Sequence, residues 1–63
     1  MDVLLITLDG VVENCICADS VERALQFYPG HTCMERTSAL AHVGPGHTYD
    51  AGAGAFTAPP PPP

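Results

Sequence analysis

The stretch "VLLITLDGVVENCIC", residues 3–17, decides the fold. Two runs of apolar and β-branched residues flank Asp9 and Gly10, and such runs are typical of β-strands. The Asp-Gly pair predicts a two-residue type I′ turn, because both central positions of that turn need a positive φ. We therefore expect a β-hairpin with strands at 2–8 and 11–18 and a structural turn at Asp9 and Gly10.

A two-residue turn fixes which residues lie opposite each other in the hairpin. The expected pairs are Leu8 with Val11, Ile6 with Glu13 and Leu4 with Cys15. Apolar residues then occur on both faces, whereas a hairpin with one solvated face alternates apolar and polar residues. We expect one face to pack against the helix and third strand of its own chain, and the other to meet another subunit.

A short helix is expected within "ADSVERALQFYPG", residues 18–30. Asp19 is a suitable N-cap, and Glu22 follows three residues later, as in a capping box. One apolar stripe has helical spacing and consists of Val21, Ala24, Leu25 and Tyr28. A Pro-Gly pair then ends the helix. The next stretch, "HTCMERTS" at residues 31–38, predicts a third strand.

These elements predict an α+β fold, a small β-β-α-β unit at residues 1–42. Residues 43–63 hold most of the glycines and prolines, which argue against a regular element, and we expect an extended Pro-rich arm there. Its last residues, 59–63, are all proline and favour polyproline II, which rises about 3.1 Å per residue. Because so small a domain is marginally stable alone, we also expect support from neighbouring subunits.

Charge and composition exclude several partners. The net charge is -5, with two arginines and no lysine, whereas nucleic-acid binding needs a basic surface. The apolar run at residues 3–6 is too short to span a membrane, and no basic flank precedes it. Three cysteines, an odd number, indicate free thiols in a reducing compartment. We expect a soluble protein made in the cytoplasm, with neither nucleic-acid nor membrane partners.

A metal site is the main chemical alternative. Cys15 and Cys17 are two residues apart on one strand and point to the same side, and His31 and Cys33 repeat that spacing. On neighbouring strands, the two pairs would offer donor types that zinc prefers. However, Cys15 and Cys17 lie in an apolar strand, where a free cysteine packs as a small hydrophobe. We expect no metal and no cofactor, and keep a Cys/His metal-binding or redox module as a lesser alternative.

The sequence offers no catalytic constellation. A cysteine nucleophile needs a nearby base and a shaped pocket, and a chain of this length is too small to build a sizeable cleft. The three histidines fall in extended or loop regions. The Gly-rich segments follow no strand-to-helix junction and so form no phosphate-binding loop. We therefore expect a protein that is not an enzyme.

The expected arm carries two large aromatic residues, Tyr49 and Phe56. A polyproline segment is stiff before it binds, so docking costs little entropy, and buried aromatic side chains often dominate interfaces. Asp50 suits an Asx-type turn after Tyr49. The predicted partner-binding residues are Tyr49, Asp50, Phe56, Pro59, Pro60 and Pro61.

Three stretches together, "DGVVENCICAD", "SVERALQFYPG" and "VGPGHTYDAGAGAFTAPPPPP", resemble a group of small proteins of tailed bacteriophages. Their pattern is a strand, a turn and an Asn-Val-Ile-Val-like strand, with a Gly-x-Gly-(Trp/Tyr)-x-Tyr-Asp ending followed by Phe and prolines. The same ending appears on tail-fibre and tail-fibre-assembly-like proteins. The matching residues are Asn14, Ile16, Gly44, Gly46, Tyr49, Asp50 and Phe56. Cys15 and Cys17 stand where the pattern has valine-like residues, and His47 where an aromatic residue is common.

The resemblance implies a non-enzymatic structural subunit of a phage virion, made in the host bacterial cytoplasm. It favours a tail, baseplate or fibre-attachment accessory protein, because the C-terminal motif recurs on tail proteins. The implied partners are other virion proteins, arranged in many symmetric copies. A capsid accessory or cement protein and a tail-fibre assembly factor remain as alternatives.

Overall fold

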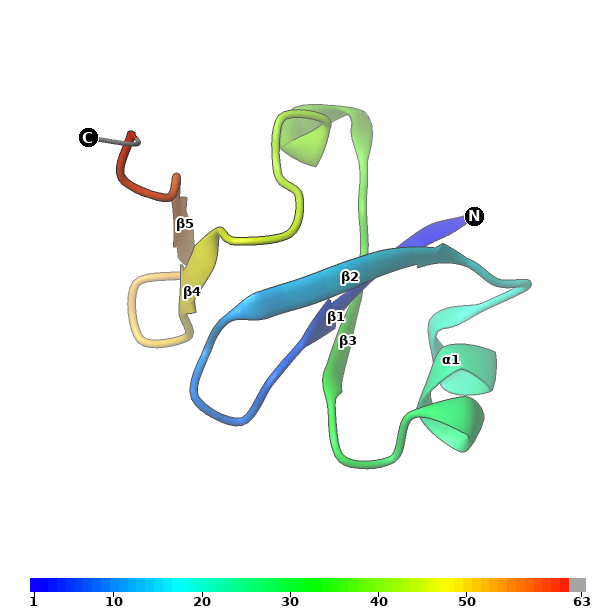
Figure 1. Ribbon diagram of the computed structural model, residues 1–63. Coiled ribbons are helices and arrows are strands. Elements are labelled where there is room, and N and C mark those ends of the chain that lie inside the picture. The colour runs from blue at the N-terminus through cyan, green and yellow to red at the C-terminus, as the bar shows by residue number, and fades with distance from the viewer. Residues whose placement is uncertain (62–63) are drawn as a thin grey trace.

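The computed structural model describes residues 1–61, which form a three-stranded antiparallel sheet, one short α-helix and a separate two-stranded hairpin (Figure 1). The sheet has the order β2-β1-β3. Its strands and the helix are β1 (Asp2–Ile6), β2 (Val12–Cys17), α1 (Val21–Phe27) and β3 (Thr32–Glu35). A 3₁₀ turn, η1 (Ser38–Leu40), leads to the hairpin of β4 (Thr48–Asp50) and β5 (Ala55–Thr57). The expected α+β class and β-β-α-β order are confirmed.

The turn between β1 and β2 differs from the predicted type I′ turn. The Gly10 N–H donates to the Thr7 carbonyl at 2.9 Å, and the Thr7 N–H donates to the Val11 carbonyl at 2.8 Å. Gly10 has φ +85°, whereas none of the described residues other than glycines has a positive φ. Asp9 therefore lacks the conformation that a type I′ turn needs, and that prediction is wrong. The connection is the longer loop 8–10, in which glycine alone takes the left-handed region.

The longer loop is accompanied by a change of register within the hairpin. Leu4 lies opposite Cys15, as expected, but Ile6 lies opposite Val12 rather than Glu13. The register shifts between Leu5 and Ile6, and this β-bulge takes Glu13 out of the expected pairing. As a result Val12 is only 1% exposed, while the Glu13 carboxylate stays in solvent, where it keeps its hydration. The predicted pairs of Ile6 with Glu13 and Leu8 with Val11 are wrong.

The N-cap of helix α1 lies one residue later than predicted. The Ser20 hydroxyl, not the Asp19 carboxylate, caps it by accepting a hydrogen bond from the Arg23 N–H at 3.0 Å. Ala24 is the helix residue that is fully buried. Leu25 and Tyr28, which belong to the predicted apolar stripe, remain 40% and 38% exposed. The helix therefore packs on the sheet through a narrow contact centred on Ala24.

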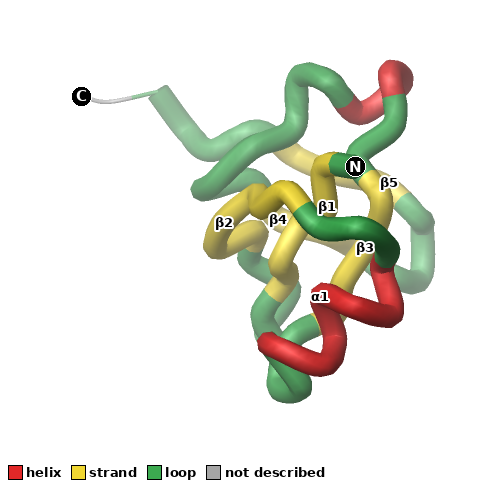
Figure 2. Tube along the Cα trace, turned by 90° about the vertical axis from the view of Figure 1, so that its right-hand side faces the viewer, coloured by secondary structure: helices red, strands yellow, loops and turns green. Residues whose placement is uncertain are grey.

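The chain covers both faces of its own sheet, with α1 and the β4–β5 hairpin on opposite sides (Figures 1 and 2). Val3 and Leu5 are buried on one face, on the side of α1. The other face contributes Leu4, Ile6 and Val12 to a core cluster with Val43, and Leu40, Tyr49 and Phe56 are among the residues that pack against that cluster. The face that was expected to meet another subunit is therefore covered by the C-terminal segment of the same chain.

The expectation that no regular element follows Val43 is wrong. Strands β4 and β5 pair in antiparallel register, with Tyr49 opposite Phe56. Three hydrogen bonds join this part of the chain to the first hairpin: Val12 N–H to the His47 carbonyl (2.8 Å), Gly46 N–H to the Val12 carbonyl (2.9 Å) and Tyr49 N–H to the Gly10 carbonyl (2.7 Å). Val43, which the predicted division at residue 42 assigns to the arm, is 0% exposed. Glycines supply the turns, because Gly46 and Gly54 adopt positive φ.

Candidate interaction surface

Tyr49 and Phe56, two predicted partner-binding residues, contact each other within the fold. Their ring centroids lie 4.7 Å apart with a 34° interplanar angle, a tilted arrangement at a separation typical of aromatic pairs. Both side chains are half-buried and pack against the core cluster of Leu4, Ile6, Val12 and Val43. The remaining exposed part of each ring is the surface that a partner could reach, so their partner-binding role stays a prediction.

Asp50 forms the expected Asx-type turn. One carboxylate oxygen, Oδ1, accepts hydrogen bonds from the Gly52 N–H at 3.0 Å and the Ala53 N–H at 3.3 Å. The Asp50 carbonyl accepts a further bond from the Gly54 N–H at 2.7 Å. These bonds close the β4–β5 turn, so the contribution of Asp50 in this structure is to the hairpin itself.

The prolines follow β5 and leave the packed part of the chain. Pro59, Pro60 and Pro61 are exposed, and the described chain ends pointing away from the sheet (Figure 2). Pro59 lies beside Gly46, since a Cβ added to that glycine would stand 3.5 Å from the proline ring. Of the predicted polyproline segment 59–63, residues 62 and 63 lie outside the described residues. The three described prolines present an accessible apolar strip.

Leu8 and Phe27 are the most exposed large apolar side chains among the described residues. Neither of them was predicted from the sequence to bind a partner. Leu8, in the β1–β2 loop, is 87% exposed, and Phe27, at the end of α1, is 67% exposed. The Arg23 guanidinium lies 5.6 Å from the centroid of the Phe27 ring, a cation–π arrangement on the helix surface. Phe27 lies outside the predicted apolar stripe of the helix, and this position in the sequence already indicated that its side chain would be exposed. The sequence did not indicate the exposure of Leu8, because the predicted two-residue turn would have paired Leu8 with Val11 in the hairpin.

The four weak metal candidates do not come together. Strand β1 lies between β2, which carries Cys15 and Cys17, and β3, which carries Cys33. Cys15 pairs with Leu4 and Cys33 with Leu5, so the two thiols lie on opposite faces of the sheet. The His31 Nε2 atom lies 3.3 Å from Glu13 Oε1 instead. Over residues 1–61 no group of three or more Cys, His, Asp and Glu side chains is arranged to hold a metal ion.

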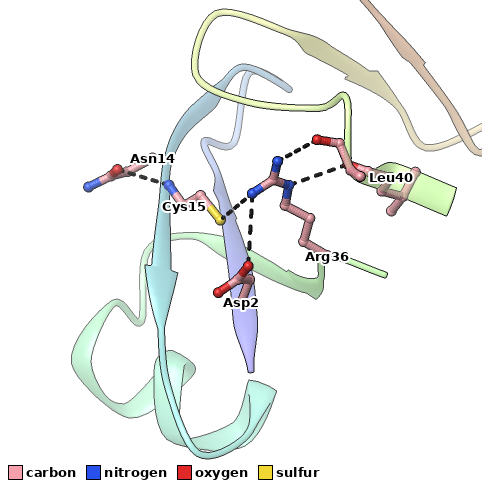
Figure 3. Close-up of polar contacts among 6 residues, drawn as sticks. Asp2, Asn14, Cys15, Arg36 and Leu40 are labelled. Atoms are coloured by element: carbon pink, nitrogen blue, oxygen red, sulfur yellow. Dashed lines mark hydrogen bonds and ion pairs between the residues drawn. The ribbon is translucent and has the colours of Figure 1, made fainter. Parts of the chain in front are cut away.

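Cys15 belongs to a polar cluster that ties η1 to the sheet (Figure 3). Arg36 Nη1 lies 3.9 Å from both Cys15 Sγ and Asp2 Oδ2. The same guanidinium donates to two backbone carbonyls, from Nε to Leu40 at 3.4 Å and from Nη2 to Ala41. Arg36 thereby holds the chain just before Val43 over the sheet. Elsewhere in the sheet, burial raises the pKa of the Cys33 thiol.

No pocket is present within residues 1–61. No helix in this part of the chain has the length and hydropathy to cross a bilayer. Comparison of the chain with protein-family models, curated proteins and solved structures finds no match. The candidate site therefore consists of the exposed apolar residues Leu8 and Phe27 and the prolines that follow β5.

Proposed function

We propose that this protein is a non-enzymatic structural subunit of a tailed-bacteriophage virion, docking on neighbouring virion proteins as a tail, baseplate or fibre-attachment accessory. The observation that carries the docking proposal is the exposure of Leu8 and Phe27 outside a core that is already closed. Burying one such side chain in a partner contributes about 1.5–3 kcal/mol. A few anchors of this kind dominate protein–protein interfaces, and Leu8 and Phe27 are the candidate anchors here.

The assignment to a virion rests on the resemblance described above. Five of its matching residues, Gly44, Gly46, Tyr49, Asp50 and Phe56, lie in the C-terminal segment that folds back over the sheet. In this chain Tyr49, Asp50 and Phe56 build the hairpin, and Gly46 bonds it to β2. A motif with such roles specifies a fold, and we propose that the resembling phage proteins share it.

The exposed prolines favour docking in a groove of a neighbouring subunit. Pro59, Pro60 and Pro61 are accessible, and polyproline segments bind apolar grooves at low entropic cost. Leu8, Phe27 and this strip would then contact different parts of one assembly. The same features serve a capsid cement protein or a tail-fibre assembly factor, which we keep as alternatives. A metal or redox module is disfavoured, because β1 separates the cysteine-bearing strands.

Quantitative mass spectrometry of purified phage particles tests this proposal. Peptides of this chain should co-purify with intact particles through density-gradient centrifugation. A few copies to tens of copies per particle would indicate the tail, whereas hundreds would indicate the head, because each structure repeats its subunits by its own symmetry. Presence in the infected-cell lysate together with absence from particles would contradict a structural subunit and favour the assembly factor.

A further inference from the structure

The outer edge of β2 is an unused pairing surface. We propose that its segment 13–17 pairs antiparallel with the same segment of a second copy of this chain, with Cys15 on the two-fold axis. The inference concerns self-association and goes beyond the proposed docking on other virion proteins. It rests on the directions of backbone groups, on the limits of the open segment and on the charges within it.

The hydrogen-bond pattern with β1 determines which β2 groups point outward. Met1 and Ala18 exchange two hydrogen bonds, from Met1 N to the Ala18 carbonyl at 2.8 Å and from Ala18 N to the Met1 carbonyl at 2.9 Å. Opposed residues of an antiparallel ladder alternate between bonded and non-bonded pairs. The pairs of Cys17 with Asp2 and of Cys15 with Leu4 are therefore non-bonded. The amide and carbonyl groups of Cys15 and Cys17 must point away from β1.

Two contacts agree with this assignment. The Asp2 carbonyl accepts a hydrogen bond from the Arg36 N–H at 2.8 Å, so it faces β3 and not Cys17. The Cys15 N–H donates to the side-chain Oδ1 of Asn14 at 2.8 Å. A side chain thus satisfies a donor that a neighbouring strand would satisfy in the interior of a sheet.

The open segment has a definite limit at its beginning. The Val12 N–H and carbonyl are bonded to His47 and Gly46, so the C-terminal segment already covers the edge at that point. At its other end, β2 stops at Cys17. The segment left open within the described fold is 13–17, whose middle residue is Cys15. A two-fold axis at Cys15 therefore pairs the whole open segment with itself.

Self-pairing in this register creates no repulsion between charges of the segment. Glu13 is the one charged residue of the segment; its backbone would lie opposite Cys17 of the second copy, while its carboxylate keeps the contact with His31 at 3.3 Å. Asn14 would lie opposite Ile16, and the two Cys15 residues would exchange backbone hydrogen bonds. A register displaced toward Val12 would collide with the covered part of the edge. These features fit a second copy, because a two-fold axis at Cys15 sets the outward amide and carbonyl of that residue against the same groups of its counterpart, and the product is one continuous antiparallel sheet.

Thiol cross-linking tests the register. The variant with Cys17→Ser and Cys33→Ala retains Cys15 as its one cysteine. Diamide should oxidise two Cys15 thiols of a dimer to a disulfide, since paired residues in this register have Cα atoms about 5.5 Å apart, within disulfide range. Non-reducing electrophoresis should show a covalent dimer that reducing agent removes. A protein that remains monomeric in sedimentation and forms no Cys15 disulfide would overturn the proposal.

Two further variants separate this inference from the proposed function. Leu8→Ser and Phe27→Ser should leave the dimer dissociation constant unchanged, because neither residue lies in segment 13–17. Loss of the dimer in these variants would assign self-association to the exposed apolar residues and overturn pairing through β2. Absence of the chain from phage particles would contradict the proposed function while leaving the β2 dimer intact.

Discussion

Tyr49 and Phe56 lie directly opposite each other in the β4–β5 hairpin, with ring centroids 4.7 Å apart, and both pack against the core cluster. The two residues thus belong to the fold of this chain before any partner is considered. They cover the sheet face that carries Leu4 and Ile6. The C-terminal segment is therefore expected to contribute to stability as well as to docking.

Phe56→Ala should lower the free energy of unfolding by about 1–3 kcal/mol. The substitution removes a half-buried ring from the core cluster and from Tyr49, and this value lies below the loss for a fully buried aromatic residue. Urea denaturation followed by circular dichroism measures the change. Thr57→Ala, at an exposed neighbouring position, is the control and should change it by less than about 0.5 kcal/mol. Equal stabilities of the two variants would contradict the packing role of Phe56.

Gly10→Ala should destabilise the protein by about 2 kcal/mol or more. Gly10 has φ +85°, which strains an alanine, and a Cβ there would stand 2.8 Å from the Tyr49 carbonyl oxygen. Gly44→Ala is the matched control, because a Cβ at Gly44 meets no atom within 4 Å and its φ is not positive. Thermal denaturation of both variants makes the comparison. A Gly10→Ala protein that melts with the control would contradict the close approach of the loop to β4.

Arg36→Met should lower the free energy of unfolding by about 1–3 kcal/mol. The loss follows from the Leu40 and Ala41 carbonyls, which lose a charged donor, while methionine retains much of the apolar stem. Asp2→Asn should cost less than about 0.5 kcal/mol, because the Asp2–Arg36 contact is long and its carboxylate is exposed. Chemical denaturation gives both values. If Asp2→Asn cost as much as Arg36→Met, the ion pair and not the carbonyl bonds would hold η1.

Alkylation of Cys33 should require a higher pH in the folded than in the unfolded protein. Burial raises the pKa of this thiol, and the thiolate is the reactive form. For the same reason the unfolded state loses this proton first, so the contribution of Cys33 to stability falls as pH rises from the ordinary thiol pKa toward the folded value. Iodoacetamide labelling with mass spectrometry, with and without urea, measures the shift. Identical pH profiles in both states would contradict burial as its cause.

The elements of the sheet could be predicted because their patterns are long. Apolar runs and a breaker pair marked the first hairpin, and a helical stripe ending at Pro29 marked α1. Local details were harder. The register depended on whether Asp9 takes a positive φ, and in the structure it does not, so Val12 rather than Glu13 lies opposite Ile6.

The C-terminal hairpin could not be predicted from periodicity, because each of its strands holds a single large apolar side chain. Strands Thr48–Asp50 and Ala55–Thr57 are too short to show alternation. Their long-range hydrogen bonds to the first hairpin leave no local sequence signal. One sign was present: Tyr49 and Phe56 lie at equal distances in sequence from the middle of the turn that Asp50 closes. The exposure of Leu8 depended on the same turn geometry and was missed with it.

The incorporation of variants into phage particles tests the central claim, docking through exposed apolar residues, most directly. Leu8→Ser combined with Phe27→Ser should leave the fold intact, because both side chains lie outside the core. When it is co-expressed with the unaltered chain during infection, mass spectrometry of purified particles should find the double variant depleted at least about tenfold, because two apolar anchors are lost. Ala39→Ser, an exposed substitution in η1, should be incorporated normally. Equal incorporation of the double variant and the unaltered chain would contradict the account.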